Sequence, residues 1–129
     1  MKGSLHLPDC SFCHRAVEKD YDGARWIHDA PGIMNFEPLN PVTPGHRLFV
    51  PMVHVEHGQL LARIVASTFQ AAYEYATMGR LVGQQPGTDF NLIISSGAAA
   101  TQTMAHIHVH YVPRRPNDKL HLPWTGQKK

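Results

Sequence analysis

The chain has 129 residues, of which 43% are hydrophobic and 17% are charged, and these values are ordinary for a soluble globular protein. A chain of this length forms one domain around a single core. Twelve basic and ten acidic residues leave a net charge of +2, which argues against a dedicated nucleic-acid-binding surface. The sequence has no secretory h-region and no apolar run near the ~18 residues of a membrane span. We therefore expect no membrane insertion and a cytoplasmic location.

The N-terminal part of the chain combines an unpatterned start with two cysteines. We expect residues 1–9 to form a loose lead-in and residues 10–23 to form a polar knuckle and loop. Cys10 and Cys13 have a C-x-x-C spacing. In a chain without a secretory signal, this spacing favours a metal or redox role over a structural disulfide. Two reduced cysteines without a metal are the alternative.

The middle of the chain predicts short strands followed by one long helix. Turn residues separate three runs of strand type, and we expect strands at Ala24–His28, Ile33–Phe36 and His46–Pro51. Pro38–Gly45 is an extended, proline-rich loop. From about Glu56 to Val82, apolar and small residues recur at intervals of three and four, which predicts a helix.

The last third predicts two strands and a tail. We expect strands at Asp89–Ser95 and Met104–Val112, separated by a small-residue loop, Gly97–Thr103. A domain over residues 10–115 and a C-terminal arm over 116–129 follow from this pattern. The order of elements predicts an α+β fold with a mainly antiparallel sheet of about five strands and one long helix.

Three alternating histidines, His106, His108 and His110, stand out within the last predicted strand. A strand has a side-chain period of two, so this spelling places three imidazoles on one face and three apolar side chains on the other. Because the chain contains ten histidines, the spacing alone is only suggestive. Three histidines on one face suit either phosphoryl chemistry or the ligation of a cation.

Phosphoryl chemistry requires a neutral imidazole with one free nitrogen. The middle ring, His108, can attack phosphorus if an acceptor holds its other nitrogen and fixes the tautomer. Flanking rings can donate to phosphate oxygens or assist the leaving group. The loop before the strand supplies further donors: Ser95, Ser96, Gly97, Thr101, Gln102 and Thr103. The sequence has neither a P-loop nor a dinucleotide-binding motif.

Several segments together resemble the histidine triad (HIT) family of nucleotide hydrolases and transferases. His106–Val112 resembles the family's H-φ-H-φ-H-φ-φ signature, and Asn40–Pro51 resembles its N-P-x-x-P-G-H-x-L-φ-φ-P segment. Gln102 and Thr103 resemble its G-Q-[ST] loop, and the cysteine pair resembles that of many bacterial members. The resemblance covers roughly residues 10–115 and implies a HIT-like fold.

The resemblance implies a role for each histidine near the reacting phosphate. His108 would be the nucleophile that attacks the α-phosphorus and forms a covalent nucleotidyl-histidine. His110 would contact the phosphate and assist the leaving group, and His46 would support the triad by hydrogen bonding. The implied substrates are phosphoramidates, dinucleoside polyphosphates or nucleotide sugars. The alternative is a nucleotide- or metal-binding module with little turnover.

The resemblance also implies substrate contacts, with three departures from the family pattern. Phosphate oxygens would be held by Gln102 and Thr103, and the base would lie near Ile33 and Phe36. The usual ribose-binding acid is replaced by Pro38, so the neighbouring Glu37 is the candidate for that role, although a one-residue shift in a strand turns a side chain to the other face. The family's loop glycine is Thr101, and its loop asparagine is Ser95, which stays a candidate substrate contact.

A zinc site and a dimer complete the implied picture. In zinc-containing members, the matching ligands are Cys10, Cys13, His54 and His106, with His57 as the alternative to His54. The metal would be structural. Family members commonly form homodimers through the long helix and an adjoining strand, for which Tyr73 and Tyr75 are candidates. His6, His28 and His121 have no partner pattern and are interpreted as surface histidines.

Overall fold

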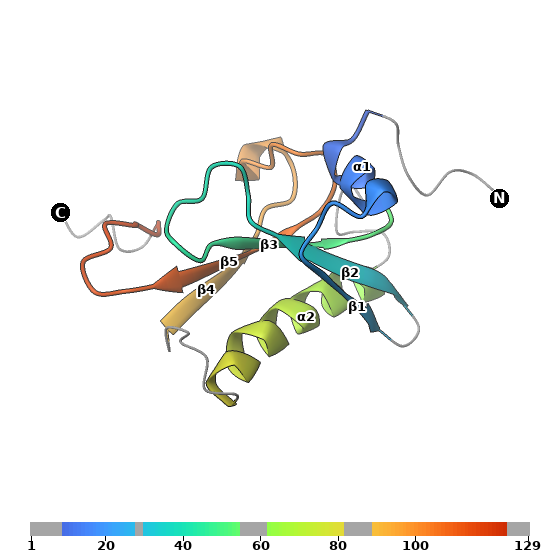
Figure 1. The fold of residues 1–129 in the computed structure, drawn as a ribbon. Coiled ribbons are helices and arrows are strands. Elements are labelled where there is room, and N and C mark those ends of the chain that lie inside the picture. The colour runs from blue at the N-terminus through green and yellow to red at the C-terminus, as the bar shows by residue number, and fades with distance from the viewer. Residues whose placement is uncertain (1–8, 28–29, 55–61, 82–88, 124–129) are drawn as a thin grey trace.

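The computed structural model describes residues 9–27, 30–54, 62–81 and 89–123. Their centre is a five-stranded sheet in the order β1-β2-β3-β5-β4, in which every neighbouring pair is antiparallel. The strands are β1 Gly23–Ile27, β2 Ala30–Phe36, β3 Arg47–Pro51, β4 Asp89–Ile94 and β5 Val109–Arg114. Two helices flank the sheet, one over each face (Figure 1). The predicted α+β fold with an antiparallel sheet of about five strands is confirmed.

Helix α2, Ala62–Leu81, covers one face of the sheet. Its small residues Ala71, Ala72 and Ala76 are buried against Phe49 and Val109. Alanines at the contact let the helix backbone approach the strands closely. The helix lies within the predicted range Glu56–Val82, of which residues 56–61 and 82 lie outside the described part of the chain.

Helix α1, Ser11–Glu18, lies over the opposite face and corrects the prediction of a polar knuckle and loop. The Sγ atom of Cys10 caps it by accepting the N–H of Cys13, and Lys19 ends it in the left-handed region with φ 61°. Phe12, Cys13 and Ala16 are buried on one side of the helix. Two turns are too short for helical periodicity to emerge from a sequence.

The triad segment also differs from the prediction. Strand β5 begins at Val109, so His106 and His108 precede the ladder instead of lying in a strand from Met104. His106, Ile107, His108 and Val109 are all buried. The predicted separation into a histidine face and an apolar face nevertheless holds, because His106 and His108 both pack against Phe12 of α1, whereas Ile107 and Val109 pack on the side of α2.

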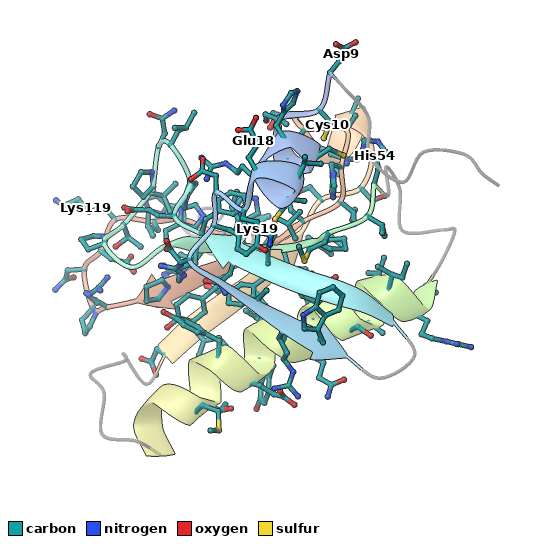
Figure 2. All side chains as sticks on the ribbon, turned by 45° about the vertical axis from the view of Figure 1, so that its right-hand side comes forward. Asp9, Cys10, Glu18, Lys19, His54 and Lys119 are labelled. Carbon is teal, nitrogen blue, oxygen red and sulfur yellow. The ribbon has the colours of Figure 1, made fainter. Side chains whose placement is uncertain are left out.

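The two ends of the described chain lie far apart, with α1 and the C-terminal arm towards opposite edges of the sheet (Figure 1). Cys10 and His54 lie near each other beside α1, whereas Lys119 of the C-terminal arm lies far from them (Figure 2). Among the described helices, none combines the length and apolarity required to cross a bilayer.

Candidate functional site

His108 is held in a single tautomer by the residue two positions before it. Its Nδ1 atom lies 2.9 Å from the carbonyl oxygen of the buried His106. A carbonyl only accepts, so Nδ1 carries the proton and Nε2 keeps its lone pair. Burial lowers the pKa of His108, and the hydrogen bond to His106 opposes this shift. At neutral pH the ring is therefore uncharged, with the lone pair of Nε2 available.

A second chain of hydrogen bonds fixes the tautomers of His46 and His110. The N–H of Val42 donates to Nδ1 of His46 at 3.1 Å, so the proton of His46 is on Nε2. That Nε2 lies 3.0 Å from Nδ1 of His110 and donates to it. His110 consequently carries its own proton on Nε2, where it remains for a substrate.

The environment keeps both of these rings neutral. Burial, followed by the neighbouring His108 and His46, lowers the pKa of His110 to about 4. Burial also lowers the pKa of His46, while the charge of Glu37 raises it. The exposed Glu37 therefore lies near enough to His46 to act on it electrostatically.

A cavity of about 390 Å³ joins the three histidines His46, His108 and His110. The rings of His108 and His110 lie 5.1 Å apart between centroids. Both Ser95 and Thr103, predicted as substrate contacts, line the cavity. The remaining lining residues come from β4 and β5, from two loops and from the C-terminal arm: Val42, Asn91, Ile93, Thr101, Val112, Arg114, Leu120, His121 and Leu122.

The C-terminal arm contributes to this cavity, although none of its residues was predicted as a site residue from the sequence. Leu120, His121 and Leu122 line it. His121 is exposed, as expected for a surface histidine, and borders the cavity from the solvent side. The signal in the sequence was the apolar pair Leu120 and Leu122 in an otherwise polar tail. The sequence did not show where the arm runs over the domain, because the pairing of Arg114 with Asp118 determines its course.

Arg114 and Asp118 hold the arm in place. The guanidinium of Arg114 donates to both carboxylate oxygens of Asp118 at 2.8 and 3.1 Å. It also donates to Asn91 Oδ1 and to the carbonyl of Leu120, each at 2.7 Å. Asp118 accepts the backbone N–H groups of Arg115 and Leu120. Hydrogen bonding from Arg114 holds the pKa of Asp118 well below its usual range.

Gln102 lies in the loop before the triad, and its side chain forms hydrogen bonds within that loop. Its Oε1 accepts the N–H of Gly97 at 2.7 Å, and its Nε2 donates to the carbonyl of Met104 at 2.8 Å. These two bonds close the loop around the short 3-10 turn Ala98–Ala100. Thr101, where the family has glycine, adopts the left-handed region with φ 68°. The side chain of Gln102 thus shapes the loop before the triad.

The structure does not bring Ile33 and Phe36 to the cavity. Phe36 pairs with Leu48, which pairs with His110, so Phe36 shares the face of His110 at two strands' distance. It is buried under α1 against Phe12, with ring centroids 5.6 Å apart. Ile33 is buried on the opposite face, against α2. Both side chains belong to the core.

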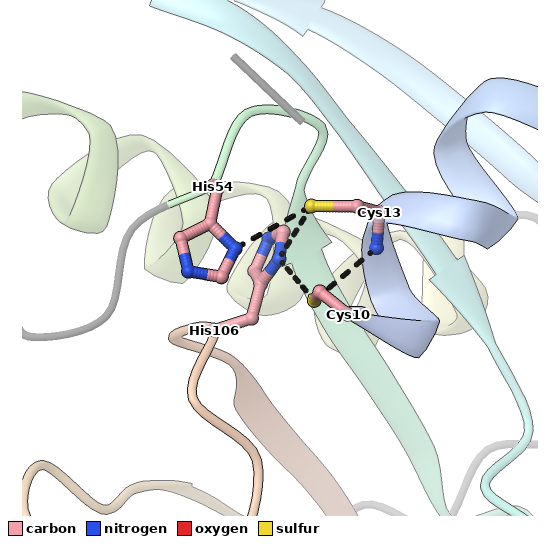
Figure 3. Close-up of side chains that lie close together, drawn as sticks. All are labelled: Cys10, Cys13, His54 and His106. Atoms are coloured by element: carbon pink, nitrogen blue, oxygen red, sulfur yellow. Dashed lines mark hydrogen bonds between the residues drawn. The ribbon is translucent and has the colours of Figure 1, made fainter. Parts of the chain in front are cut away.

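Four further predicted residues form a compact cluster beside the triad (Figure 3). The potential ligand atoms of Cys10, Cys13, His54 and His106 all lie within 4.8 Å of one another. Nδ1 of His106 is 3.3 Å from Cys10 Sγ and 3.6 Å from Cys13 Sγ, and Nδ1 of His54 is 3.4 Å from Cys13 Sγ. The fallback ligand, His57, lies outside the described residues.

The cluster fits a structural zinc ion. Sulfur and nitrogen donors at zinc-binding distances in a tetrahedron are separated by about 3.3–3.8 Å, as these pairs are. Nε2 of His106 donates to the carbonyl of Pro51 at 2.8 Å, which leaves the lone pair of Nδ1 directed at the cysteines. Two thiolates and two imidazoles form a closed donor set that suits Zn²⁺.

Comparisons with known proteins agree with this geometry. The family model described as HIT domain matches residues 23–117. Adenylylsulfatase HINT3 of Arabidopsis thaliana is 30% identical over 120 residues, which cover 92% of this chain and 57% of that protein. The chain thus spans little more than half the length of this relative. An uncharacterised HIT-like protein of Mycobacterium tuberculosis is 30% identical over 112 residues, covering 86% of this chain and 75% of that one.

Solved structures give the same result. A Zn-bound histidine triad family protein from Mycobacterium smegmatis superposes with a TM-score of 0.70 at 28% identity, covering 88% of this chain and 81% of that one. A histidine triad protein from Clostridium difficile superposes with a TM-score of 0.66 at 25% identity, covering 92% and 97%.

Proposed function

Because the chain belongs to the histidine triad family, we propose that it is a nucleotide hydrolase or nucleotidyl transferase that uses His108 as its nucleophile. One observation carries the assignment: the bond from Nδ1 of His108 to the carbonyl of His106 leaves Nε2 as a lone pair at the cavity. A neutral imidazole in this tautomer is prepared for attack on phosphorus.

The reaction has two displacements at the α-phosphorus. Nε2 of His108 forms a bond to phosphorus as the bond to the leaving group breaks. Water then attacks the same phosphorus, the N–P bond breaks, and a nucleoside monophosphate leaves; a second acceptor in place of water gives transfer. Nε2 of His110 donates a hydrogen bond to the phosphate oxygens and gives its proton to the departing group. In the second displacement the attacking water returns a proton to this Nε2, and His46 holds the ring in place throughout.

The geometry argues against the alternative of a three-histidine cation site. The ring of His106 faces Cys10 and Cys13, away from the other two. Nδ1 of His108 donates to a carbonyl, and Nδ1 of His110 accepts from His46. The three imidazoles therefore have three different partners instead of one shared centre, and they serve two sites.

The remaining predicted contacts receive roles from their positions. Ser95 and Thr103 line the cavity and supply hydroxyl donors to phosphate oxygens. Gln102 acts through the loop it closes. Glu37, which acts electrostatically on His46, is the candidate for the ribose hydroxyls.

The leaving group lies against the C-terminal arm in this proposal. Ile93, Val112, Leu120 and Leu122 give that end of the cavity an apolar lining. Arg114, the cation in the lining, donates to Asp118, Asn91 and the carbonyl of Leu120. A compact, uncharged leaving group, such as the amine of a phosphoramidate, fits this surface better than the polyphosphate of a dinucleoside polyphosphate.

A substrate panel tests the function. Adenosine phosphoramidate, adenylyl sulfate and a dinucleoside polyphosphate are compared by the release of nucleoside monophosphate. The phosphoramidate is expected to give the highest kcat/KM, and rapid acid-free quenching is expected to trap labelled nucleotide on His108. His108→Ala should abolish both signals while the circular dichroism spectrum stays unchanged. Normal turnover by that variant would refute the mechanism.

The proposal includes a structural zinc ion and a homodimer. Cys10, Cys13, His54 and His106 would hold the zinc, which would lock α1 to the sheet. The exposed side chains of α2, with Tyr73 56% and Tyr75 44% accessible, support a second copy as partner. Metal analysis should find one zinc per chain, and sedimentation should give a dimer at micromolar concentration.

A further inference from the structure

His106 belongs to two sites at once. Its ring faces Cys10 and Cys13, with Nδ1 3.3 and 3.6 Å from their sulfur atoms, and its Nε2 donates to the carbonyl of Pro51. Its backbone carbonyl accepts the proton of Nδ1 of His108. A rotation of the His106 peptide therefore cannot leave the nucleophile unchanged.

Helix α1 makes a second connection through Phe12. This residue lies between the two cysteines in sequence and is buried. Its ring packs edge-on against His106, with centroids 5.6 Å apart, and against His108, with centroids 5.3 Å apart. The two cysteines lie at the start of α1 on either side of Phe12, so they also help to hold the Phe12 ring against the ring of His108.

The backbone between these contacts lacks the support of the sheet. Strand β5 begins at Val109, so the peptide groups of His106 and His108 precede the ladder with β3 and β4. The contacts of the His106 side chain, together with the packing of the buried Ile107, hold this segment where the described ladders do not reach. Removal of those contacts would free the carbonyl that fixes His108.

We infer that the cluster of Cys10, Cys13, His54 and His106 positions the nucleophile, with zinc bound there setting the tautomer of His108. The inference rests on the role proposed for His108. Without the metal, the carbonyl of His106 leaves Nδ1 of His108, and the ring populates the tautomer with its proton on Nε2. That tautomer presents an N–H to phosphorus and cannot attack it. His106 is thus a positioning residue that acts through its carbonyl.

The tautomer of His108 can be read directly. Long-range ¹H–¹⁵N spectra are recorded near pH 8, where histidines are neutral, for the zinc-loaded chain, for the same chain after chelation, and for Cys13→Ser. With zinc, His108 should show one protonated nitrogen, Nδ1. After zinc is removed, its two nitrogen shifts should converge, and kcat should fall about tenfold with little change in KM. Val17→Ala, an exposed change on the same helix, should behave as the parent protein does.

The outcomes separate this inference from the proposed function. An unchanged His108 tautomer in a chain proven free of zinc would overturn the inference, and so would a chain that binds no zinc. If the tautomer of His108 changes with zinc but the protein has no hydrolytic activity, the link between the zinc cluster and His108 is upheld and the proposed function is refuted.

A second variant keeps the test decisive if Cys13→Ser fails to fold by circular dichroism. His54→Ala leaves α1 and His106 intact and weakens zinc binding, so that the metal can be removed and restored. The tautomer of His108 should follow the metal in that variant, and a tautomer indifferent to it would also overturn the inference.

Discussion

Nε2 of His46 lies 3.0 Å from Nδ1 of His110, although the two residues are 64 positions apart in the chain. The bond fixes which nitrogen of His110 carries a proton, because His46 itself accepts from the N–H of Val42. One backbone amide in the proline-rich loop therefore determines, through two rings, which nitrogen of His110 carries a proton at the cavity.

Replacement of His46 by alanine should remove that control. His110 would then exchange between tautomers, and kcat is expected to fall about ten- to hundredfold with a small change in KM, as for other residues that orient a reacting group. Steady-state kinetics on the best substrate of the panel measure the effect. A kcat equal to that of the parent protein would show that the bond has no role in turnover.

The pKa of His110, lowered to about 4, predicts how stability depends on pH. Between about 4 and the unfolded value of about 6.5, the unfolded chain binds more protons at this residue than the folded chain does. The free energy of unfolding should therefore be maintained above pH 6.5 and decrease as the pH falls towards 4.

Melting temperatures of the parent and of His110→Gln, measured from pH 7.5 to 4, test this dependence. The variant should show a shallower decline, since it lacks the buried ring that must be protonated. Parallel curves would contradict the lowered pKa. His46, whose pKa is also lowered by burial, contributes in the same direction in both proteins.

Asp118→Ala should release the C-terminal arm without touching the histidines. The arm loses the acceptor of two backbone N–H groups and of the Arg114 guanidinium. We expect kcat/KM to fall roughly tenfold, because a wall that orients the leaving group becomes loose. The loss should differ between substrates that share a nucleotide and vary in leaving group. Equal losses for every leaving group would show that the arm does not contact it.

Thr101→Gly should stabilise the protein. A β-branched residue in the left-handed region costs roughly 1–2 kcal/mol. Glycine removes this strain, but it loses more backbone entropy on folding, which offsets part of the gain. The net gain in the free energy of unfolding should be about 0.5–1 kcal/mol, measured by urea denaturation. Ala100→Gly is the matched control, since no positive φ occurs there, and it should destabilise the protein. A loss of stability in Thr101→Gly would indicate that the hydroxyl, which bonds to the carbonyl of Ala100, matters more than the backbone strain.

Much of the fold could be predicted because its elements carry strong local patterns. The period of two in Asp89–Ile94 and the period near four in Ala62–Leu81 predict a strand and a helix without knowledge of their neighbours. Helix α1 lacked such a pattern, because eight residues give too few repeats. Its stability depends on partners distant in sequence, among them Phe36 and His106.

The candidate site shows the same division. Cys10, Cys13, His54 and His106 were predicted as a group from their resemblance to a family, and the structure places their ligand atoms together. The arm's contribution depended on how Arg114 pairs with Asp118, which spacing alone does not reveal. The resemblance placed the base near Ile33 and Phe36; the structure buries both side chains and leaves them outside the lining of the histidine cavity, and apolar character does not distinguish a binding surface from a core.

The place of β5 in the sheet has a consequence for the order in which the strands can pair during synthesis. Strands β1, β2 and β3 can pair as soon as they leave the ribosome, but β4 has no partner until β5 is made, because β5 lies between β3 and β4 (Figure 1). Strand β5 therefore joins the two parts of the described sheet, and the segment before it brings His106 to a cysteine 96 residues earlier in the chain. The proposed zinc cluster, the core and the histidine site therefore all depend on the segment that runs from His106 into β5, and a chain interrupted before His106 would lack all three.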